Sequence, residues 1–324
     1  MKRSIKDRLL TSNVKKKAGL ILLFAVTFLL TSRAAVTDEQ DWAWWNQLHN
    51  WEPGMPSWKR YIIISPGYLG PNALPVPEMK KGLIPLKSEI SISASHHSHS
   101  GDPTQDLSAK IFLPFANGRI AIEVYGVFYE KYGYTETVRN ERFSRNRTGI
   151  GTAEGDLYFS TMIQICRDRI FPNTLVRMAG RTASGSDFYA ARFSDAPGYF
   201  FDISMSKDIF LGHNFMIKPF GVAGFYIWQT NSDQYLQNDA FLYGVGMDIK
   251  IHNFLLSGNF SGYNGYINNK DRPQLVTGSI RYDWSNFALS FEYLHGLRDW
   301  EYRTVRFTAA YKFRGIYSDN NTSK

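Results

Sequence analysis

The residues best suited to chemistry lie in one stretch, Ser-His-His-Ser-His-Ser-Gly-Asp, from residue 95 to residue 102. His96 and Ser98 stand two positions apart, so both side chains point to the same side of an extended strand. An imidazole placed there can act as a base toward the serine hydroxyl, as in a nucleophilic hydrolase. The stretch therefore offers an alternative catalytic pair, in competition with an exposed polar loop that has no catalytic residue.

The same stretch contains a second pair of histidines with metal-ligand spacing. His97 and His99 also share one side of a strand, and imidazole is a good ligand for transition metals. Two histidines without a fixed third ligand make a weak site. We expect no metal and no cofactor, and keep these two residues only as an alternative metal site.

The His-Ser pair falls at the end of the first of twelve segments in which apolar and polar residues alternate. Such alternation is typical of strands that show one face to lipid. Longer connectors follow the odd segments and tight turns follow the even ones, which predicts an antiparallel up-and-down transmembrane β-barrel with long loops outside the cell. The predicted strands are 86–95, 107–115, 119–131, 154–165, 173–183, 198–207, 215–228, 241–251, 254–263, 274–284, 287–294 and 303–313.

The chain divides into four predicted parts. Residues 1–34 place basic residues before a short apolar run and small residues, which is the pattern of a secretory signal peptide. Residues 35–85 hold five of the eight tryptophans and seven of the thirteen prolines. Proline this dense excludes a regular helix or central strand, so we expect an irregular periplasmic arm or plug. The barrel takes residues 86–313, and residues 314–324 form a tail.

The basic composition comes mostly from the signal peptide. Removing residues 1–34 takes away eight of the 37 basic residues and one of the 29 acidic ones, which leaves a net charge of about +1 instead of +8. We therefore expect no nucleic-acid partner. The expected partners are outer-membrane lipids, lipopolysaccharide and the outer-membrane assembly machinery. Both termini are expected in the periplasm, and the oligomeric state is left open.

The alternation also predicts which charged side chains point into the lumen. Both signs are interleaved there, which fits either a narrow polar pore with little charge selectivity or an internal network that only satisfies buried charge. The expected lumen residues are Lys110, Glu123, Asp156, Arg177, Arg181, Asp202, Asp248, Lys250, Arg281, Asp283, Glu292 and Arg306.

A connector rich in arginine follows the third predicted strand. Four arginines stand in it within nine residues, opposed only by Glu141. Because guanidinium groups suit bidentate contact with phosphate, we expect this connector to touch lipopolysaccharide, with a solvated loop as the alternative. The four residues are Arg139, Arg142, Arg145 and Arg147.

Aromatic residues gather near the ends of the predicted strands. Such positions are typical of the two aromatic girdles at the membrane interfaces. We therefore expect most of these rings to point outward. They are Tyr129, Tyr132, Tyr134, Tyr199, Phe200, Phe201, Trp228, Trp284, Trp300 and Tyr302.

Two resemblances to known families accompany these patterns. The stretch around His96-His97-Ser98 and Asp102-Pro103-Thr104 resembles outer-membrane phospholipase A, a twelve-stranded barrel whose active strand carries H-x-S-x-G followed by D-P-T. Here the glycine is Gly101, one position late, and Lys110 stands where that family has its orienting asparagine. This resemblance implies a phospholipase-like enzyme or lipid A esterase. Residues 65–78, 155–159, 195–202 and 268–273 together resemble an uncharacterised outer-membrane barrel family of Bacteroidota-type bacteria, which implies location and fold but no activity.

The sequence as a whole predicts a small-solute channel or passive uptake barrel with a mixed-charge lumen, and favours a protein that is not an enzyme. The first alternative is an outer-membrane lipid hydrolase that uses the His-x-Ser pair on the lipid face. The second is a non-conducting structural or surface-binding barrel.

Overall fold

The structure is a computed structural model that describes residues 42–167, 170–212 and 214–314. The predicted signal peptide and the tail after Arg314 lie outside these residues. Within the described residues, no helix is long and apolar enough to cross a membrane.

The chain separates into two compact units, Met1–Trp51 and Glu52–Lys324. The described part of the first unit contains one short helix, α2 (Ala43–His49), in which Trp45 is buried. All further elements belong to the second unit. Its short helices are η1 (Trp58–Tyr61), η2 (Ala116–Gly118), α3 (Glu136–Glu141) and η3 (Phe188–Ala190).

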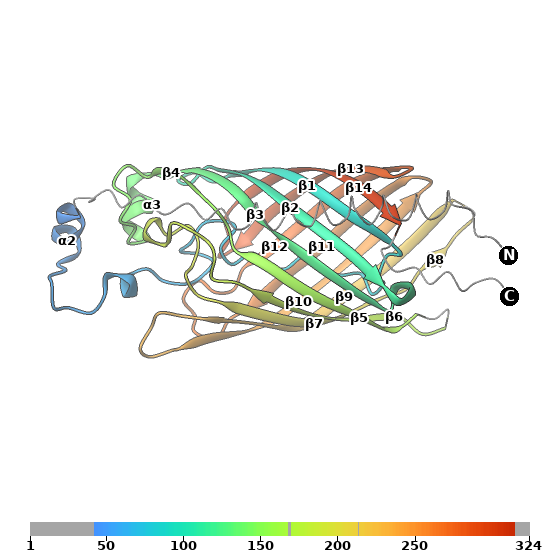
Figure 1. Ribbon diagram of the computed structural model, residues 1–324, viewed down its shortest axis with the longest axis horizontal. Helices are drawn as coiled ribbons and strands as arrows, with labels where there is room; N and C mark the ends of the chain where they lie inside the picture. Colours follow the sequence, from blue (N-terminus) through green and yellow to red (C-terminus); the bar gives the residue numbers. More distant parts are fainter. Residues whose placement is uncertain (1–41, 168–169, 213, 315–324) are drawn as a thin grey trace, which may run out of the picture. The chain divides into compact units, whose positions relative to one another are not determined.

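Twelve antiparallel strands close into a barrel, as predicted (Figure 1). Each strand pairs with its neighbours along the chain, and the last pairs with the first to close the ring. The barrel strands are β1 (Lys87–Ser98), β2 (Thr104–Phe115), β3 (Ile120–Gly133), β5 (Leu157–Cys166), β6 (Asn173–Arg181), β7 (Gly198–Ser206), β9 (Phe215–Gln229), β10 (Gln237–Ile251), β11 (Phe254–Asn264), β12 (Gln274–Trp284), β13 (Phe287–Arg298) and β14 (Arg303–Arg314). Two short additional strands, β4 (Ile150–Ala153) and β8 (Ile209–Phe210), pair with β3 and β9.

Tight turns join the strands at one end of the barrel, the short-turn end. The turn between β2 and β3 contains Asn117 and Gly118 with φ of 56° and 76°, a left-handed conformation that these two residue types adopt most easily. At the other end, the long-connector end, the longest connectors are residues 134–156, 182–197, 230–236 and 265–273. Two connectors there, 99–103 and 299–302, are shorter than predicted because the flanking strands continue further.

The two faces of the barrel wall differ in polarity. Along β7, buried and exposed residues alternate without a break from Gly198 to Ser206, as the pleat requires. The exposed residues are large and apolar, as at Phe201, Ile203 and Met205. An apolar outer face around a polar inner face is the architecture of an outer-membrane β-barrel.

Residues 62–86, the lumen segment, run inside the barrel. Its five prolines prevent a ladder with the wall, and it forms no regular strand or helix. Lys80 reaches β3 and Lys81 reaches β10 and β11, so its side chains contact different sides of the wall. Residues 62–85 of the predicted arm or plug therefore lie in the lumen.

The lumen segment connects the two ends of the barrel. The carbonyl of Ile62 accepts a hydrogen bond from Asn231 at the long-connector end. The carbonyl of Ile84 accepts one from Arg167 at the short-turn end, close to where β1 begins. Residues 59–62 and the end of β14 therefore lie at opposite ends, which corrects the expectation of an arm on the side of the short turns.

Candidate functional site: the occupied lumen

The first half of the lumen segment is held by inward side chains of the wall. Prolines lack the N–H of a ladder, so the carbonyls of this half need side-chain donors. Four donors, three on different barrel strands and one in the connector 299–302, supply them at 2.7–3.1 Å. They are Trp228 Nε1 to Ile64, Trp300 Nε1 to Pro71, Arg181 Nη1 to Ala73 and the Tyr263 hydroxyl to Leu74.

Apolar packing fixes the same half. Leu69 and Leu74 are almost completely buried, in one cluster with aromatic rings of the wall such as Tyr226 and Tyr263. Burying two leucines fully contributes on the order of 3–6 kcal/mol before losses of entropy are counted. This half is therefore a firm anchor.

The second half of the lumen segment combines ion pairs with two small apolar contacts, in which buried Met79 joins Phe220 and buried Ile84 joins Met162. Lys80 lies 2.8 Å from Glu123, and Lys81 lies 2.7 Å from Asp248. On the segment, Glu78 accepts from Lys110 of β2 at 2.7 Å. The wall thus offers each charge of the segment an opposite charge.

Other predicted lumen charges pair within the wall. Arg177 with Asp202 and Arg181 with Asp156 are buried pairs between neighbouring strands or connectors. The half-buried pairs are Arg281 with Glu89, Arg306 with Glu292, and Lys312 with Asp283. The inward charges therefore form a network, in which the lumen segment takes part.

One predicted lumen residue stands apart from this network. Lys250 of β10 is exposed, and it makes no ion pair within the described part of the chain. Its neighbour on the same face, Asp248, is the one that binds Lys81.

A buried cluster at the long-connector end was not predicted from the sequence. The carboxylate of Asp102 accepts from Arg142 at 2.6 Å, from Arg192 at 2.8 Å and from the Tyr302 hydroxyl. Burial alone raises the pKa of a carboxyl, but the two guanidinium groups and the hydroxyl outweigh it and lower the pKa of Asp102 to about 2. Its four members come from four separate connectors, so no spacing in the sequence relates them.

Arg192 joins this cluster to the lumen segment. It is fully buried and donates to Glu130 at 2.8 Å, and its guanidinium stacks over the Tyr132 ring at 4.6 Å. Asn72 of the lumen segment donates to the same Glu130 at 2.8 Å and to Asp106 at 3.1 Å. The segment thus supplies donors that the buried carboxylates of the wall require.

The structure places the four connector arginines in different environments. Arg142 and Arg145 are buried, the first on Asp102 and the second over the Trp58 ring at 4.8 Å. Arg139 pairs with Glu136, and Arg147 is exposed. Arg142 and Arg145 therefore already have partners inside the protein, and lipopolysaccharide contact by this connector stays a prediction.

The histidine stretch is divided between the two faces of β1. His96 and Ser98 are exposed on the outer face, where Gln105 of β2 stands opposite His96. Lys110, at the position of the orienting asparagine in phospholipase A, points inward to Glu78. The structure therefore brings the predicted His-Ser pair to the lipid face without that third residue.

Three of the four ring nitrogens of the alternative metal pair make hydrogen bonds within the protein. Both ring nitrogens of buried His97 are engaged, with Asp106 at 2.6 Å and Thr304 at 2.7 Å. His99 Nδ1 accepts from the Gly101 amide at 3.1 Å. No group of three or more potential metal ligands occurs among the residues that the structure covers.

Most of the predicted girdle rings point inward, contrary to expectation. The exposed ones are Tyr129, Tyr199, Phe201 and Trp284. Those that are buried, in part against the lumen segment, are Tyr132, Tyr134, Phe200, Trp228, Trp300 and Tyr302. Inward aromatic rings at the long-connector end pack against the lumen segment. The girdle rule concerns only rings that face the membrane, so it does not predict such inward rings.

Comparison with known proteins supports the fold. Neither a protein-family model nor a curated protein sequence matches the chain. Among solved structures, an outer membrane channel from Pseudomonas putida F1 is similar with a TM-score of 0.50 at 10% identity, over 75% of this chain and 97% of that one. KdgM porin (TM-score 0.42, 10% identity, 69% and 99% covered) and NanC porin (0.43, 11%, 69% and 100%) are less similar. At such low identity the likeness shows the barrel fold.

Proposed function

We propose that the protein is an outer-membrane channel for small polar solutes, closed at rest by its own lumen segment. The observation that carries this proposal is the pairing of Lys80 and Lys81 with carboxylates of the wall, in a half of the segment whose apolar clusters are much smaller than the cluster around the first half. Water that enters the lumen can hydrate both partners of an ion pair, whereas it cannot replace an apolar core. The second half of the segment is thus the part that can leave the wall.

The inner wall suits passage of small solutes once the segment has moved. It carries carboxylates such as Glu123 and Asp248 beside guanidinium groups such as Arg281 and Arg306. Mixed charge of this kind favours a pore with little selectivity between cations and anions. The similarity to a named outer membrane channel agrees with this proposal.

Swelling of proteoliposomes in a small neutral sugar tests the proposal. The wild-type protein should give slow swelling, and Lys80→Gln with Lys81→Gln should accelerate it several-fold, because both ion pairs are lost. Replacing the exposed Arg119 and Arg147 by glutamine removes the same charge outside the lumen and serves as the control. Equal swelling of all three proteins would contradict a closing role for the segment.

The orientation in the membrane is part of the proposal. With the long connectors outside the cell, the end of β14 faces the periplasm, and residues 59–62 lie at the cell surface. Lys59 pairs with Asp195, and Arg60 pairs with Asp233, so the connectors hold this stretch at their own end of the barrel. Cleavage of an inserted protease site at residue 54 on intact cells would support this orientation, and cleavage only after the outer membrane is opened would contradict it.

The ion pairs of Lys59 and Arg60 with the connectors favour a second candidate function. In it, the barrel does not conduct and instead holds residues 52–58 at the long-connector end, where they bind a partner. This candidate predicts that no substitution in the lumen segment induces swelling, which separates it from the channel. The lipid hydrolase with His96 and Ser98, the resemblance to the Bacteroidota-type family, and the lipid and assembly partners all stay predictions. Lipid release that depends on Ser98 would establish the enzyme.

A further inference from the structure

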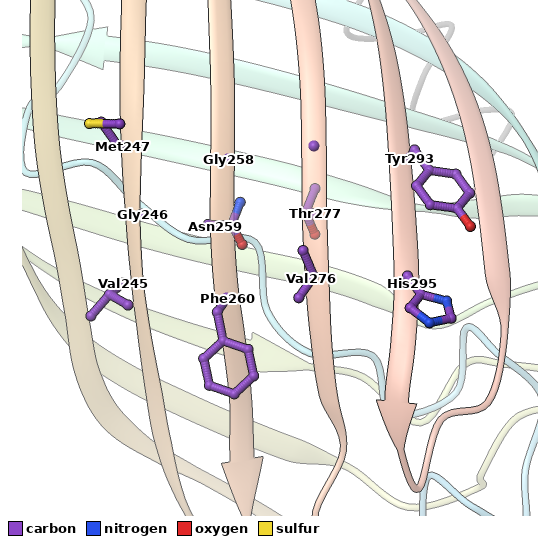
Figure 2. Close-up of a pocket in the computed structure, with 11 residues that line it drawn as sticks. Val245, Gly246, Met247, Gly258, Asn259, Phe260, Val276, Thr277, Tyr293 and His295 are labelled. Atoms are coloured by element: carbon purple, nitrogen blue, oxygen red, sulfur yellow. The ribbon is translucent and has the colours of Figure 1, made fainter.

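The outer face of the barrel has a hollow of about 890 Å³ that crosses four strands, β10 to β13. Figure 2 shows Val245 and Met247 along one side, and Tyr293 and His295 along the other. Phe260 and Val276 lie between them. The hollow lies on the face that carries exposed apolar residues, so its sides are accessible from the membrane.

Two glycines create the hollow. Gly258 of β11 stands directly opposite Gly278 of β12, and both are exposed on the outer face. A Cβ atom at either position would meet no atom within 4 Å. In the same row, Met247 is opposite Gly258 and Tyr293 is opposite Gly278, so two large side chains flank two missing ones.

A positive charge stands beside this hollow, toward the long-connector end. Arg303 of β14 is opposite His295 of β13 and is exposed. Within the described ranges, the Arg303 side chain makes no ion pair or hydrogen bond. His295 Nδ1 is likewise buried without a hydrogen-bond partner. The guanidinium therefore has free donors next to an apolar groove.

We propose that this hollow binds one acyl chain of a membrane lipid whose phosphate lies on Arg303. The apolar side chains and the two glycines fit a hydrocarbon chain, and charge complementarity fits an anionic headgroup. The His295 ring, which lines the hollow and is opposite Arg303, bounds the groove on the side of the phosphate. The occupant is an amphiphile, because the apolar groove and the free cation adjoin on one face.

Native mass spectrometry of the purified full chain in neutral detergent tests this proposal with dioleoyl phosphatidic acid as the probe. We expect one tightly held lipid per barrel. Arg303→Gln should weaken binding about tenfold, through loss of a charge-assisted contact. Gly278→Leu should weaken it by a similar factor, because leucine fills the groove.

Two matched controls separate the site from general effects. Gly180 is also an exposed glycine with open space around it, and it lies on β6, so Gly180→Leu should leave binding unchanged. Lys131 is another exposed cation at the long-connector end, and Lys131→Gln should also bind normally. Equal weakening by the control variants would overturn the proposal.

Competition by each half of the probe, the diacylglycerol and the phosphate, shows whether the site binds a lipid or a free anion. Dioleoylglycerol, which lacks the phosphate, and inorganic phosphate, which lacks the chains, should each compete at least tenfold more weakly than the intact lipid. Competition by inorganic phosphate alone at the strength of the lipid would show a free-anion site and contradict the lipid proposal. If Gly278→Leu fails to assemble, lipid binding by Arg303→Gln still tests the proposal, and unchanged binding by this variant would contradict it.

Discussion

At the scale of single residues, Asp102 is the centre of the buried cluster at the long-connector end. Two guanidinium groups and a tyrosine hydroxyl surround a carboxylate that water does not reach. Removing one partner of such a group leaves a buried charge uncompensated, which costs about 3–5 kcal/mol. The cluster therefore ties the connectors of the long-connector end together.

The lowered pKa of Asp102 predicts a specific acid sensitivity. A carboxyl whose pKa in the folded state is about 2 instead of 3.8 stabilises the fold above pH 4, and this contribution, about 2 kcal/mol, is lost as the pH falls from 4 to 2. Thermal unfolding in detergent should show this loss for the wild type and much less of it for Asp102→Asn. Replacing exposed Asp239 by asparagine is the control. An unchanged pH profile in Asp102→Asn would contradict the assignment.

Two connector arginines should differ in their effect on stability. Arg142→Gln should lower the unfolding temperature equally in lipopolysaccharide-containing membranes and in neutral detergent, because its partner Asp102 is inside the protein. Arg147→Gln should change it little in detergent, since Arg147 is exposed. Thermal unfolding in both media measures the difference. A loss for Arg142→Gln that appears only with lipopolysaccharide would restore a direct lipid contact.

At the scale of elements, the pleat of β14 predicts which substitutions the membrane rejects. Phe307 is 61% exposed on the outer face. Phe307→Arg should impair assembly, because a charge near the middle of the membrane costs about 2–4 kcal/mol. Val305→Arg, one outward position closer to the strand end, should cost less. Heat-modifiable mobility of the extracted barrels reports assembly, and equal yields of Phe307→Arg and wild type would contradict the assigned face.

The strands could be predicted from the sequence because successive side chains of a strand point to opposite faces, so apolar and polar residues alternate with a period of two. This period placed Phe307 on the outside and Glu123 on the inside. It carries no information for residues 62–86, where proline interrupts any repeat and contacts such as Lys81 with Asp248 join residues 167 positions apart. The occupied lumen, and the inward turn of rings such as Trp228, could therefore not be predicted.

At the scale of the whole molecule, the barrel and the lumen segment have opposite requirements. The wall needs every backbone group paired to exist in lipid, and its closed ring of strands provides this. The lumen segment lacks a ladder and depends on side chains of the wall. These form one large apolar cluster around its first half, and ion pairs with two small apolar clusters around its second half. A firm anchor followed by an ion-paired half is the arrangement expected of a closed channel that opens by moving one part.

Single-channel recording in planar bilayers tests this central claim most directly. The wild-type protein should stay mostly closed, and Lys80→Glu with Lys81→Glu should give long openings, because each new carboxylate faces Glu123 or Asp248. Arg119→Glu with Arg147→Glu makes the same change in net charge at exposed sites and should behave as the wild type. Long openings in all three proteins, or none in the lysine variant once it is shown to be folded, would contradict a channel closed by its lumen segment.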